Sequence, residues 1–399
     1  MNLKDKTVIL GITGSIAAYK MADVASALSK MHCDVHTIMT KNATEIITPL
    51  TFSTLTSHHC IVDTFDKNIN YNVAHVALAK KADALLIAPA TANIIAKLAC
   101  GLADDMLTTT TLACTCPKII APAMNTAMFE NPVVQRNIET LRQDGWVVIE
   151  PASGVLACKD TGKGKLPDPS VLMDYVLKEI ACKKDLNGKK YLVTAGPTYE
   201  ALDPVRFLSN HSSGRMGYAI ARMAMLRGAD VTLISGPTSL TPIPFITTLS
   251  VTSAADMAEA VLSLAPQQDV IIKAAAVADF TPLQTADEKI KKHDGALNLA
   301  LKKTQDILRT LGTQKRPGQF ICGFSMETQN LEENSRKKLF DKKIDMIVAN
   351  NLREEGAGFQ GNTNRVTLIT ADQVTPLPLL SKNDVALKIL DAIKASQSL

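Results

Sequence analysis

The stretch that decides the fold covers residues 191–217 and reads YLVTAGPTYEALDPVRFLSNHSSGRMG. It begins with a short apolar run rich in β-formers, residues 191–194, which AGPT at 195–198 breaks. SSG at 212–214 then precedes a helical pattern of apolar residues over 216–226. We therefore expect a strand, a polar loop and a helix start here, so that a new α/β unit begins halfway along the chain.

The N-terminus follows the same plan. TVIL at residues 7–10 runs into GITGS at 11–15, and good helix formers follow from 16 to 31. In both places free backbone N–H groups and the positive end of a helix dipole would face the space over the loop, which favours phosphate. The two openings predict two nucleotide-type sites, although strand–glycine–helix junctions are also common where no ligand binds.

Bulk composition limits the class of protein. A chain of 399 residues with 46% hydrophobic and 21% charged residues predicts two or three ordinary globular domains. The net charge of +4 is too small to indicate a nucleic-acid or membrane partner. The apolar run at 7–12 fits neither a signal peptide nor a membrane span, and the eight cysteines lack the regular CxxC pairs of a zinc site. We expect a cytoplasmic protein whose cysteines remain thiols.

The first half has the pattern of βαβ units. Buried strands are predicted at residues 8–11, 35–39, 84–88, 118–121 and 146–149, with helix-length segments between them, notably 16–31 and 94–103. Ligands of parallel sheets bind beyond the carboxyl ends of the strands. The loops in which we expect the site are therefore residues 11–15, 40–42, 89–93 and 122–125. Apart from Lys41 they contain small or hydrogen-bonding residues, which suits a cofactor held by backbone and hydroxyl groups.

The pattern changes in the middle of the chain. Residues 151–169, PASGVLACKDTGKGKLPDP, predict a surface flap because so few of them could be buried. A helix is predicted at 171–180, and the polar residues 182–190 are expected to form a linker between domains 1–181 and 191–399.

The second half repeats the α/β pattern without an obvious residue-level repeat. Its strands are predicted at residues 191–194, 231–234, 270–273, 320–324, 346–348 and 366–369. The fold class that we predict is therefore α/β, with two doubly wound Rossmann- or flavodoxin-like domains and mainly parallel sheets.

Several motifs resemble known families. GSIAAYK at 14–20, His75, PAMNTAMF at 122–129 and AC at 157–158 resemble the flavin-containing cysteine decarboxylases. DPVRFLSNHSSGRMG at 203–217, AAAVADF at 274–280 and EKIKK at 288–292 resemble the phosphopantothenate–cysteine ligases. The two halves in this order closely resemble the bifunctional coenzyme A biosynthesis proteins of bacteria over nearly the whole chain.

The decarboxylase resemblance implies FMN in the first domain. The residues it places around FMN are Gly14, Ser15, Ile16, Thr40, Thr91, Ala92, Asn93, Ile94 and Ala123. It also implies His75 and Cys158 as catalytic residues and Asn125 as the ligand of the substrate carboxylate. Considered without the family, His75 fits an ordinary surface or core histidine, Cys158 an ordinary thiol and Asn125 a turn residue.

The implied chemistry explains these residue types. A cysteine carboxylate held through an amide has no electron sink, so direct loss of CO₂ would leave an unstabilised carbanion. Oxidation of CH₂–SH to a thioaldehyde by FMN would supply that sink. Cys158 is then the expected acid, and His75 the expected base or orienting group.

The ligase resemblance implies that CTP activates the carboxylate of 4′-phosphopantothenate as an acyl-cytidylate, which the amine of L-cysteine attacks. A divalent cation such as Mg²⁺ would be bound through the CTP phosphates and possibly Asp279. Asn210 is the implied catalytic amide and Lys289 a catalytic, CTP-binding lysine. The remaining implied CTP-binding residues are Asp279, Gln305, Asp306, Ile307, Leu308, Phe324, Lys338 and Lys342. Arg206 could either orient its loop or contact the substrate phosphate.

Two further functions were compared with this bifunctional enzyme. One half could be a non-catalytic regulatory or oligomerisation module, but His75, Asn125 and Cys158 are all present. Alternatively, the chain could be a flavoprotein decarboxylase of another substrate, which the fused ligase half disfavours. The resemblance also implies a homo-oligomer, a dodecamer built from decarboxylase trimers and ligase dimers.

Overall fold

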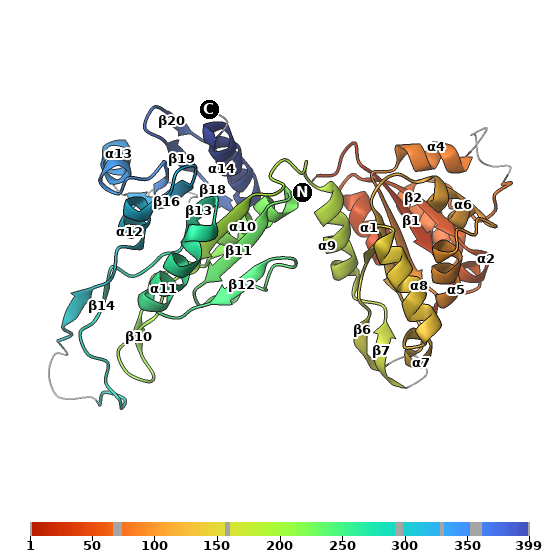
Figure 1. Ribbon diagram of the computed structural model, residues 1–399, viewed down its shortest axis with the longest axis horizontal. Coiled ribbons are helices and arrows are strands. Elements are labelled where there is room, and N and C mark those ends of the chain that lie inside the picture. The colour runs from red at the N-terminus through yellow and green to blue at the C-terminus, as the bar shows by residue number, and fades with distance from the viewer. Residues whose placement is uncertain are drawn as a thin grey trace. The chain divides into compact units, whose positions relative to one another are not determined.

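A computed structural model describes residues 2–66, 74–155, 160–291, 298–327, 331–351 and 361–397. The chain divides into two units, Met1–Cys182 and Lys183–Leu399. Their internal architecture can be followed in Figure 1, in which the first unit runs from red to yellow and the second from green to blue.

The apolar runs of the first unit form a parallel sheet of five strands within the described residues, in the order β2-β1-β3-β4-β5. The strands are β1 (Thr7–Ile12), β2 (Asp34–Met39), β3 (Ala84–Ala90), β4 (Lys118–Pro122) and β5 (Val147–Val148). Every residue of β1 and β3 is buried, as expected for central parallel strands covered on both faces. The order reverses between β1 and β3, which makes their carboxyl ends the topological switch point of a flavodoxin-like sheet.

Helices cover both faces of this sheet (Figure 1). After a 3-10 turn at Ile16–Lys20, they are α1 (Met21–Lys30), α2 (Lys41–Thr44), α3 (Pro49–Thr56), α4 (Ala74–Lys81), α5 (Ala92–Ala99), α6 (Met106–Ala113), α7 (Thr126–Phe129), α8 (Pro132–Gln143) and α9 (Pro169–Ile180). Helix α1 packs against α3 and α9. On the other face Ile9 and Ile87 of the sheet share a core with Ile95 of α5, Leu107 of α6 and Leu141 of α8.

The glycine-rich segment predicted as a flap contains a β-hairpin. Its antiparallel strands are β6 (Ala152–Val155) and β7 (Thr161–Lys165). The backbone N–H of Met124 donates a 3.0 Å hydrogen bond to the carbonyl oxygen of Gly164, so the hairpin lies against the loop after β4.

The second unit contains an eight-stranded sheet in its described part, in the order β12-β11-β8-β13-β16-β17-β19-β20. The strands are β8 (Lys190–Ala195), β11 (Asp230–Ser235), β12 (Thr247–Ser250), β13 (Val270–Lys273), β16 (Phe320–Glu327), β17 (Met346–Asn351), β19 (Val366–Ile369) and β20 (Val374–Pro376). Pairing is parallel from β12 to β17, in the Rossmann order, and antiparallel beyond it. The switch point lies between β8 and β13. The predicted fold class is confirmed.

Helices also cover both faces of the second sheet (Figure 1). They are α10 (Arg215–Leu226), α11 (Ala254–Leu264) with a 3-10 turn at Ala265–Gln267, α12 (Ile307–Gln314), α13 (Leu331–Asp341) and α14 (Lys382–Gln397). Helix α10 packs against α14, whereas α11, α12 and α13 share a core on the other side of the sheet. Short antiparallel pairs join β9 (Glu200–Ala201) to β10 (Phe207–Leu208), β14 (Phe280–Pro282) to β15 (Leu301–Lys303), and β18 (Thr363–Asn364) to β21 (Leu380–Ser381).

The second unit begins inside the stretch that the sequence predicts as a linker. The carboxylate of Asp185 accepts hydrogen bonds from both Nε and Nη2 of Arg227, at 2.9 and 2.7 Å, and from Nζ of Lys394 at 2.8 Å. These cations hold the pKa of Asp185 well below its usual range, with Arg227 contributing most. Asp185 of this stretch is therefore paired within the second unit, which sequence polarity alone does not reveal.

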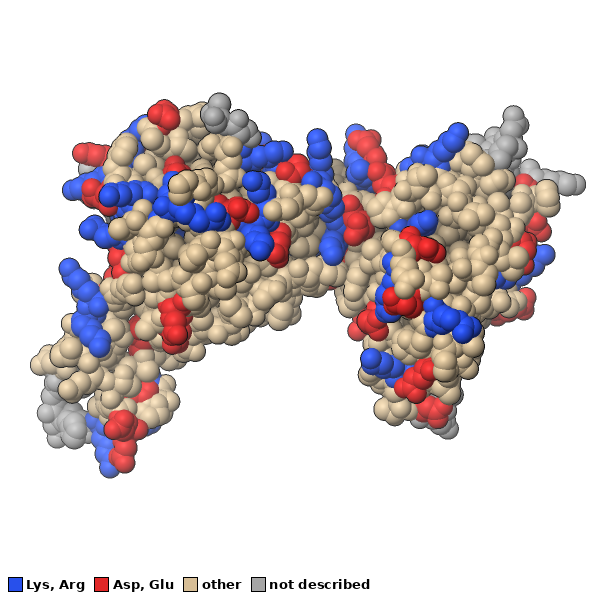
Figure 2. Space-filling model, in the orientation of Figure 1, with Lys and Arg blue, Asp and Glu red and all other residues tan. Residues whose placement is uncertain are grey.

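Basic and acidic side chains are interspersed over the face shown in Figure 2, in keeping with the small net charge. No helix in the described part of the chain combines the length and the apolar run needed to cross a bilayer.

Candidate functional site

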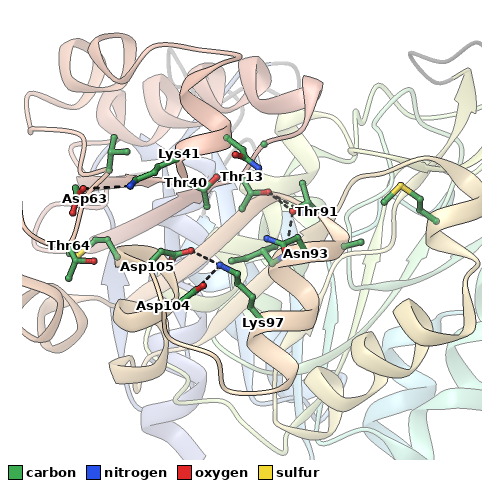
Figure 3. A pocket seen from close by; sticks show the side chains of 17 residues that line it. Thr13, Thr40, Lys41, Asp63, Thr64, Thr91, Asn93, Lys97, Asp104 and Asp105 are labelled. Atoms are coloured by element: carbon green, nitrogen blue, oxygen red, sulfur yellow. Dashed lines mark hydrogen bonds and ion pairs between the residues drawn. The ribbon is translucent and has the colours of Figure 1, made fainter.

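A cavity of about 520 Å³ lies at the switch point of the first sheet (Figure 3). It is lined by the loops that follow β1, β2 and β3, which bring together the predicted residues Gly14, Thr40, Thr91, Ala92, Asn93 and Ile94. Three of the four loops in which the sequence predicts the site, residues 11–15, 40–42 and 89–93, therefore meet at one edge of the sheet.

Threonines tie the loops together across the switch point. Thr13 Oγ1 donates to the carbonyl oxygen of Pro89 at 2.7 Å and accepts from the backbone N–H of Thr91 at 3.1 Å. Thr91 also caps α5 by accepting from the N–H of Ile94. At Gly14 a Cβ atom would lie 2.6 Å from that of Asn42, so the close approach of these two loops requires a glycine.

The cavity also contains charges that sequence reasoning missed. Lys97 Nζ lies 2.6 Å from Asp104 Oδ1 and 3.2 Å from Asp105 Oδ2 (Figure 3). Burial alone would raise the pKa of Asp105, but hydrogen bonds from Thr108 and Lys97 lower it below the usual range. The capping box of Asp105 and Thr108 could have located the start of α6. Nothing in the local sequence indicates that these residues face the cavity.

The donor set fits a phosphate-bearing cofactor. Ser15 and Thr91 cap the 3-10 turn and α5, so both helical N-termini begin at the switch point. Thr40 Oγ1 is buried and has no hydrogen-bond partner within the described part of the chain, which leaves a hydroxyl available to a ligand.

A second cavity, of about 440 Å³, brings together the predicted residues Ser15, Ile16, Ala123 and Asn125 with the β6–β7 hairpin. Asn125 caps α7 through its Oδ1, which accepts from the N–H of Ala127 at 2.9 Å. Its Nδ2 donates to Asp160 Oδ2 at 3.0 Å. The amide is thus fixed between the loop after β4 and the hairpin.

Two predicted catalytic residues of the first unit are not gathered with these cavities. His75 lies in α4, partly buried, and is not among the described residues that line either cavity. Cys158 lies outside the described residues. Their catalytic roles stay predictions.

A cavity of about 390 Å³ occupies the switch point of the second sheet, between the ends of β8 and β13. It brings together six of the predicted ligase residues, Asn210, Asp279, Leu308, Phe324, Lys338 and Lys342. Asn210 Nδ2 donates to the carbonyl oxygen of Ala276 at 2.9 Å, and the N–H of Ala276 donates to the carbonyl of Gly196 at 2.9 Å. These bonds tie the loops after β8 and β13.

Helix α10 begins at the edge of this cavity because small residues allow it to approach β8. Gly214 has φ +78° and caps the helix. A Cβ at Gly217 would lie 2.8 Å from the carbonyl oxygen of Thr194, so a larger residue would displace the helix from the strand. The N-terminus of α10 is thereby placed beside the loop that carries Asn210.

The other predicted ligase residues, Lys289, Gln305, Asp306 and Ile307, do not line the cavity among the described residues. Asp306 caps α12 and forms an ion pair with Lys342 at 3.1 Å, which positions a lysine that does line it. Ile307 is buried in the core, and Lys289 is exposed on the segment after β14.

Arg206 has the orienting contacts that the sequence left as one of two possibilities. Its Nε and Nη2 donate to Asp203 Oδ2 at 2.9 and 2.6 Å, and Nη2 also donates to the carbonyl oxygen of Ile290 at 2.7 Å. The Arg206 guanidinium holds the pKa of Asp203 well below its usual range. Arg206 therefore connects the loop before Asn210 to the segment that carries Lys289.

Cations dominate the charge of the second cavity. The lysines and arginine among its lining residues are Arg215, Lys273, Lys338, Lys342 and Lys382, against one carboxylate in the described lining, Asp279. The surplus of positive charge suits an anionic ligand such as a phosphate. Sequence reasoning missed Lys273, because it was assigned only to the predicted strand.

Comparison with known proteins matches each of the two units to a different family model. Residues 1–181 match the family model described as Flavoprotein, and residues 186–396 match that of the DNA/pantothenate metabolism flavoprotein C-terminal domain. The coenzyme A biosynthesis bifunctional protein of Bacillus subtilis (strain 168) is 48% identical over 397 residues, which cover 98% of each chain. The chain belongs to the coenzyme A biosynthesis bifunctional protein family. The resemblance predicted from the motifs is confirmed.

Two further relatives are similar over most of the chain. The protein of the same description from Escherichia coli (strain K12) is 38% identical over 396 residues, 98% of each chain. A cysteine/cysteine sulfinic acid decarboxylase from an unknown prokaryotic organism is 44% identical over 354 residues, 87% of this chain and 99% of that protein.

Proposed function

We propose that this chain catalyses two successive steps of coenzyme A biosynthesis. The second unit ligates 4′-phosphopantothenate to L-cysteine with CTP, and the first unit decarboxylates the product to 4′-phosphopantetheine. The observation that carries the proposal is the full-length match to a bifunctional coenzyme A biosynthesis protein, with one family model on each unit.

The cationic cavity of the second unit supports CTP-dependent ligation. Lys338 and Lys342 would neutralise the triphosphate, and Asp279 is the carboxylate available to a Mg²⁺ ion bound by the phosphates. Asn210, fixed by its bond to Ala276, would stabilise charge on an acyl-cytidylate. The proposed CTP site also includes Lys289, Gln305 and Ile307, which do not line the cavity among the described residues.

The two cavities of the first unit support flavin-dependent decarboxylation. Gly14, Thr40 and the segment Thr91–Ile94 would hold the FMN, which when bound supplies two-electron oxidation and reduction of the substrate. Ser15, Ile16 and Ala123 would hold it from the neighbouring cavity. Asn125 would hold the substrate carboxylate by an amide, which orients the group without the full positive charge that would oppose loss of CO₂.

Two substitutions test the assignment of one activity to each unit. Asn125→Ala should lower CO₂ release from supplied phosphopantothenoylcysteine by about 100-fold while leaving CTP-dependent pyrophosphate release unchanged. Asn210→Asp should accumulate an acyl-cytidylate, detectable by mass spectrometry, and leave decarboxylation of the supplied intermediate unchanged. Loss of both activities in either variant would refute the separation of the two sites.

A second candidate function is decarboxylation of free cysteine or cysteine sulfinic acid, because a relative of that description is 44% identical. In this case CO₂ would be released from either amino acid alone, without CTP or 4′-phosphopantothenate. The cations around the second cavity would then have no triphosphate to bind, which is why we prefer the bifunctional assignment.

We further propose that the protein acts in the cytoplasm as a homo-oligomer, with trimeric contacts between first units and dimeric contacts between second units. A closed assembly that combines threefold and twofold symmetry axes in this way is a dodecamer. Sedimentation equilibrium of the native chain tests this assembly, and a monomer at micromolar concentration would contradict it.

A further inference from the structure

Lys273 is the last residue of β13 and lines the cavity of the second unit. In the sheet it lies between Thr194 of β8 and Gly323 of β16, neither of which carries charge. Its Nζ makes no hydrogen bond or ion pair with the residues that the structure describes. The side chain therefore brings an amine to the switch point without a structural partner to account for it.

The surroundings of Lys273 favour the neutral amine. Burial, together with the charge of Lys342, lowers the pKa of Lys273 to about 8, although Asp306 and Asp279 oppose the change. Asp306 is itself paired with Lys342, at 3.1 Å. The other cations that line the cavity are Arg215, Lys338 and Lys382. A minor share of Lys273 is therefore unprotonated at pH 7, far more than for a lysine with an ordinary pKa.

The proposed ligation requires a proton acceptor at this place. Cysteine is an ammonium ion near neutral pH, and its nitrogen has no lone pair for attack until a proton is removed. The described lining contains no histidine, and its one carboxylate, Asp279, is assigned to the metal. Lys273 shares this cavity with Asn210, which is proposed to contact the acyl-cytidylate.

We propose that Lys273 is the general base that deprotonates the incoming cysteine, an inference that rests on the proposed ligase function. Lys273 Nζ takes one proton from the cysteine ammonium and frees the nitrogen lone pair. The nitrogen bonds to the acyl carbon of the acyl-cytidylate, the bond from that carbon to the phosphate oxygen breaks, and CMP leaves with the electron pair. The second nitrogen proton passes to solvent, and Lys273 releases its own proton before the next cycle.

The charge of the bound ligand changes during the reaction cycle, and this change favours first the ammonium and then the amine form of Lys273. Bound triphosphate favours the ammonium form of Lys273, which then adds to the positive charge around CTP. Departure of pyrophosphate removes most of this negative charge, and the remaining cations favour the neutral amine. The base is thus available after activation of the carboxylate, when cysteine must react.

The test separates the two half-reactions in the full-length protein. Acyl-cytidylate formation is followed as pyrophosphate release from saturating CTP and 4′-phosphopantothenate, and CMP release is followed after cysteine is added. Lys273→Met removes the amine, and Lys273→Arg keeps the charge but cannot lose a proton. Lys388→Met, on the exposed side of α14, is the matched control.

Both Lys273 variants should form the acyl-cytidylate within about threefold of the native rate, which also shows that they fold. Their CMP release should be about 100-fold slower near pH 7, and this deficit should shrink as the pH rises and free cysteine deprotonates. Hydroxylamine, which is already unprotonated near neutral pH, should restore the rate in place of cysteine. Lys388→Met should behave as the native chain.

Three results would overturn the proposal. If Lys273→Arg released CMP at the native rate, Lys273 would contribute only its positive charge and would not be the base. If both variants lost pyrophosphate release and CMP release equally, Lys273 would act only as a ligand of the bound anion. Absence of acyl-cytidylate in the native chain would contradict the ligase function itself, and this outcome is distinct from the other two.

Discussion

Asp34 is a residue whose contacts make the stability of the first unit depend on pH. Its carboxylate accepts hydrogen bonds from His58 Nε2 at 2.6 Å and His36 Nε2 at 3.2 Å, and forms an ion pair with Lys81 at 2.5 Å. The two imidazole rings are stacked, with centroids 4.3 Å apart. Burial lowers the pKa of His36, although the charge of Asp34 opposes the shift.

We expect the first unit to lose stability in mild acid. A histidine with a lower pKa in the folded than in the unfolded state binds protons more readily when unfolded, so its contribution falls as the pH drops below about 6.5. The melting temperature, followed by fluorescence of the single tryptophan, Trp146, should fall by a few degrees between about pH 7.5 and 5.5. His36→Gln should flatten this dependence, whereas the exposed control His32→Asn should not. Equal slopes in all three proteins would refute the role of His36.

At the scale of elements, the central strands could be predicted from sequence and the helix limits less well. Short buried apolar runs locate β1, β3 and β13, because central strands of a parallel sheet are covered on both faces. The predicted helix 16–31 instead begins with a 3-10 turn capped by Ser15. The predicted helix 94–103 ends at Ala99, since Gly101 adopts φ +69°. The β6–β7 hairpin was predicted only as a flap, because its glycines have low β-propensity.

The contact between the β6–β7 hairpin and the loop after β4 predicts an effect on decarboxylation but not on ligation. Gly164 has φ +136°, and a Cβ there would lie 2.2 Å from the carbonyl oxygen of Met124. Gly164→Ala should therefore lift the hairpin from the loop that carries Asn125 and lower CO₂ release at least about tenfold, while pyrophosphate release stays native. Gly145→Ala, also at positive φ but with open space around its Cβ, should cost only about 1 kcal/mol and keep both activities. Native decarboxylation by Gly164→Ala would show that the docked hairpin is not needed.

The candidate sites were predictable where they depend on topology. Loops after strands at a switch point must meet, so the segments that carry Gly14 and Thr91 could be found from the order of elements. Asn210 was predicted from the resemblance of the motif that carries it. Residues that enter a cavity from another segment could not be found in this way. Lys97 and Asp104 line the first cavity and form an ion pair with each other. The environment of Lys273 depends on residues that are distant in sequence, such as Lys342.

At the scale of the whole molecule, both units place a cavity at the switch point of a parallel sheet but line it with different kinds of residue. Each unit places its cavity where the strand order of a parallel sheet reverses, with a helical N-terminus beside it. The first cavity is lined mainly by hydroxyl, amide and apolar groups, and the second has a surplus of lysines. One chain therefore combines a site suited to a flavin with a site whose positive charge suits an anionic ligand such as a phosphate.

The central claim is that the product of the second unit is the substrate of the first. The most direct measurement supplies the native chain with 4′-phosphopantothenate, cysteine, CTP and Mg²⁺, and follows pyrophosphate and CO₂ together. We predict a yellow protein that releases pyrophosphate and CO₂ in equal amounts, with CO₂ absent when CTP or 4′-phosphopantothenate is omitted. Release of CO₂ from cysteine alone, or of pyrophosphate without CO₂, would contradict it.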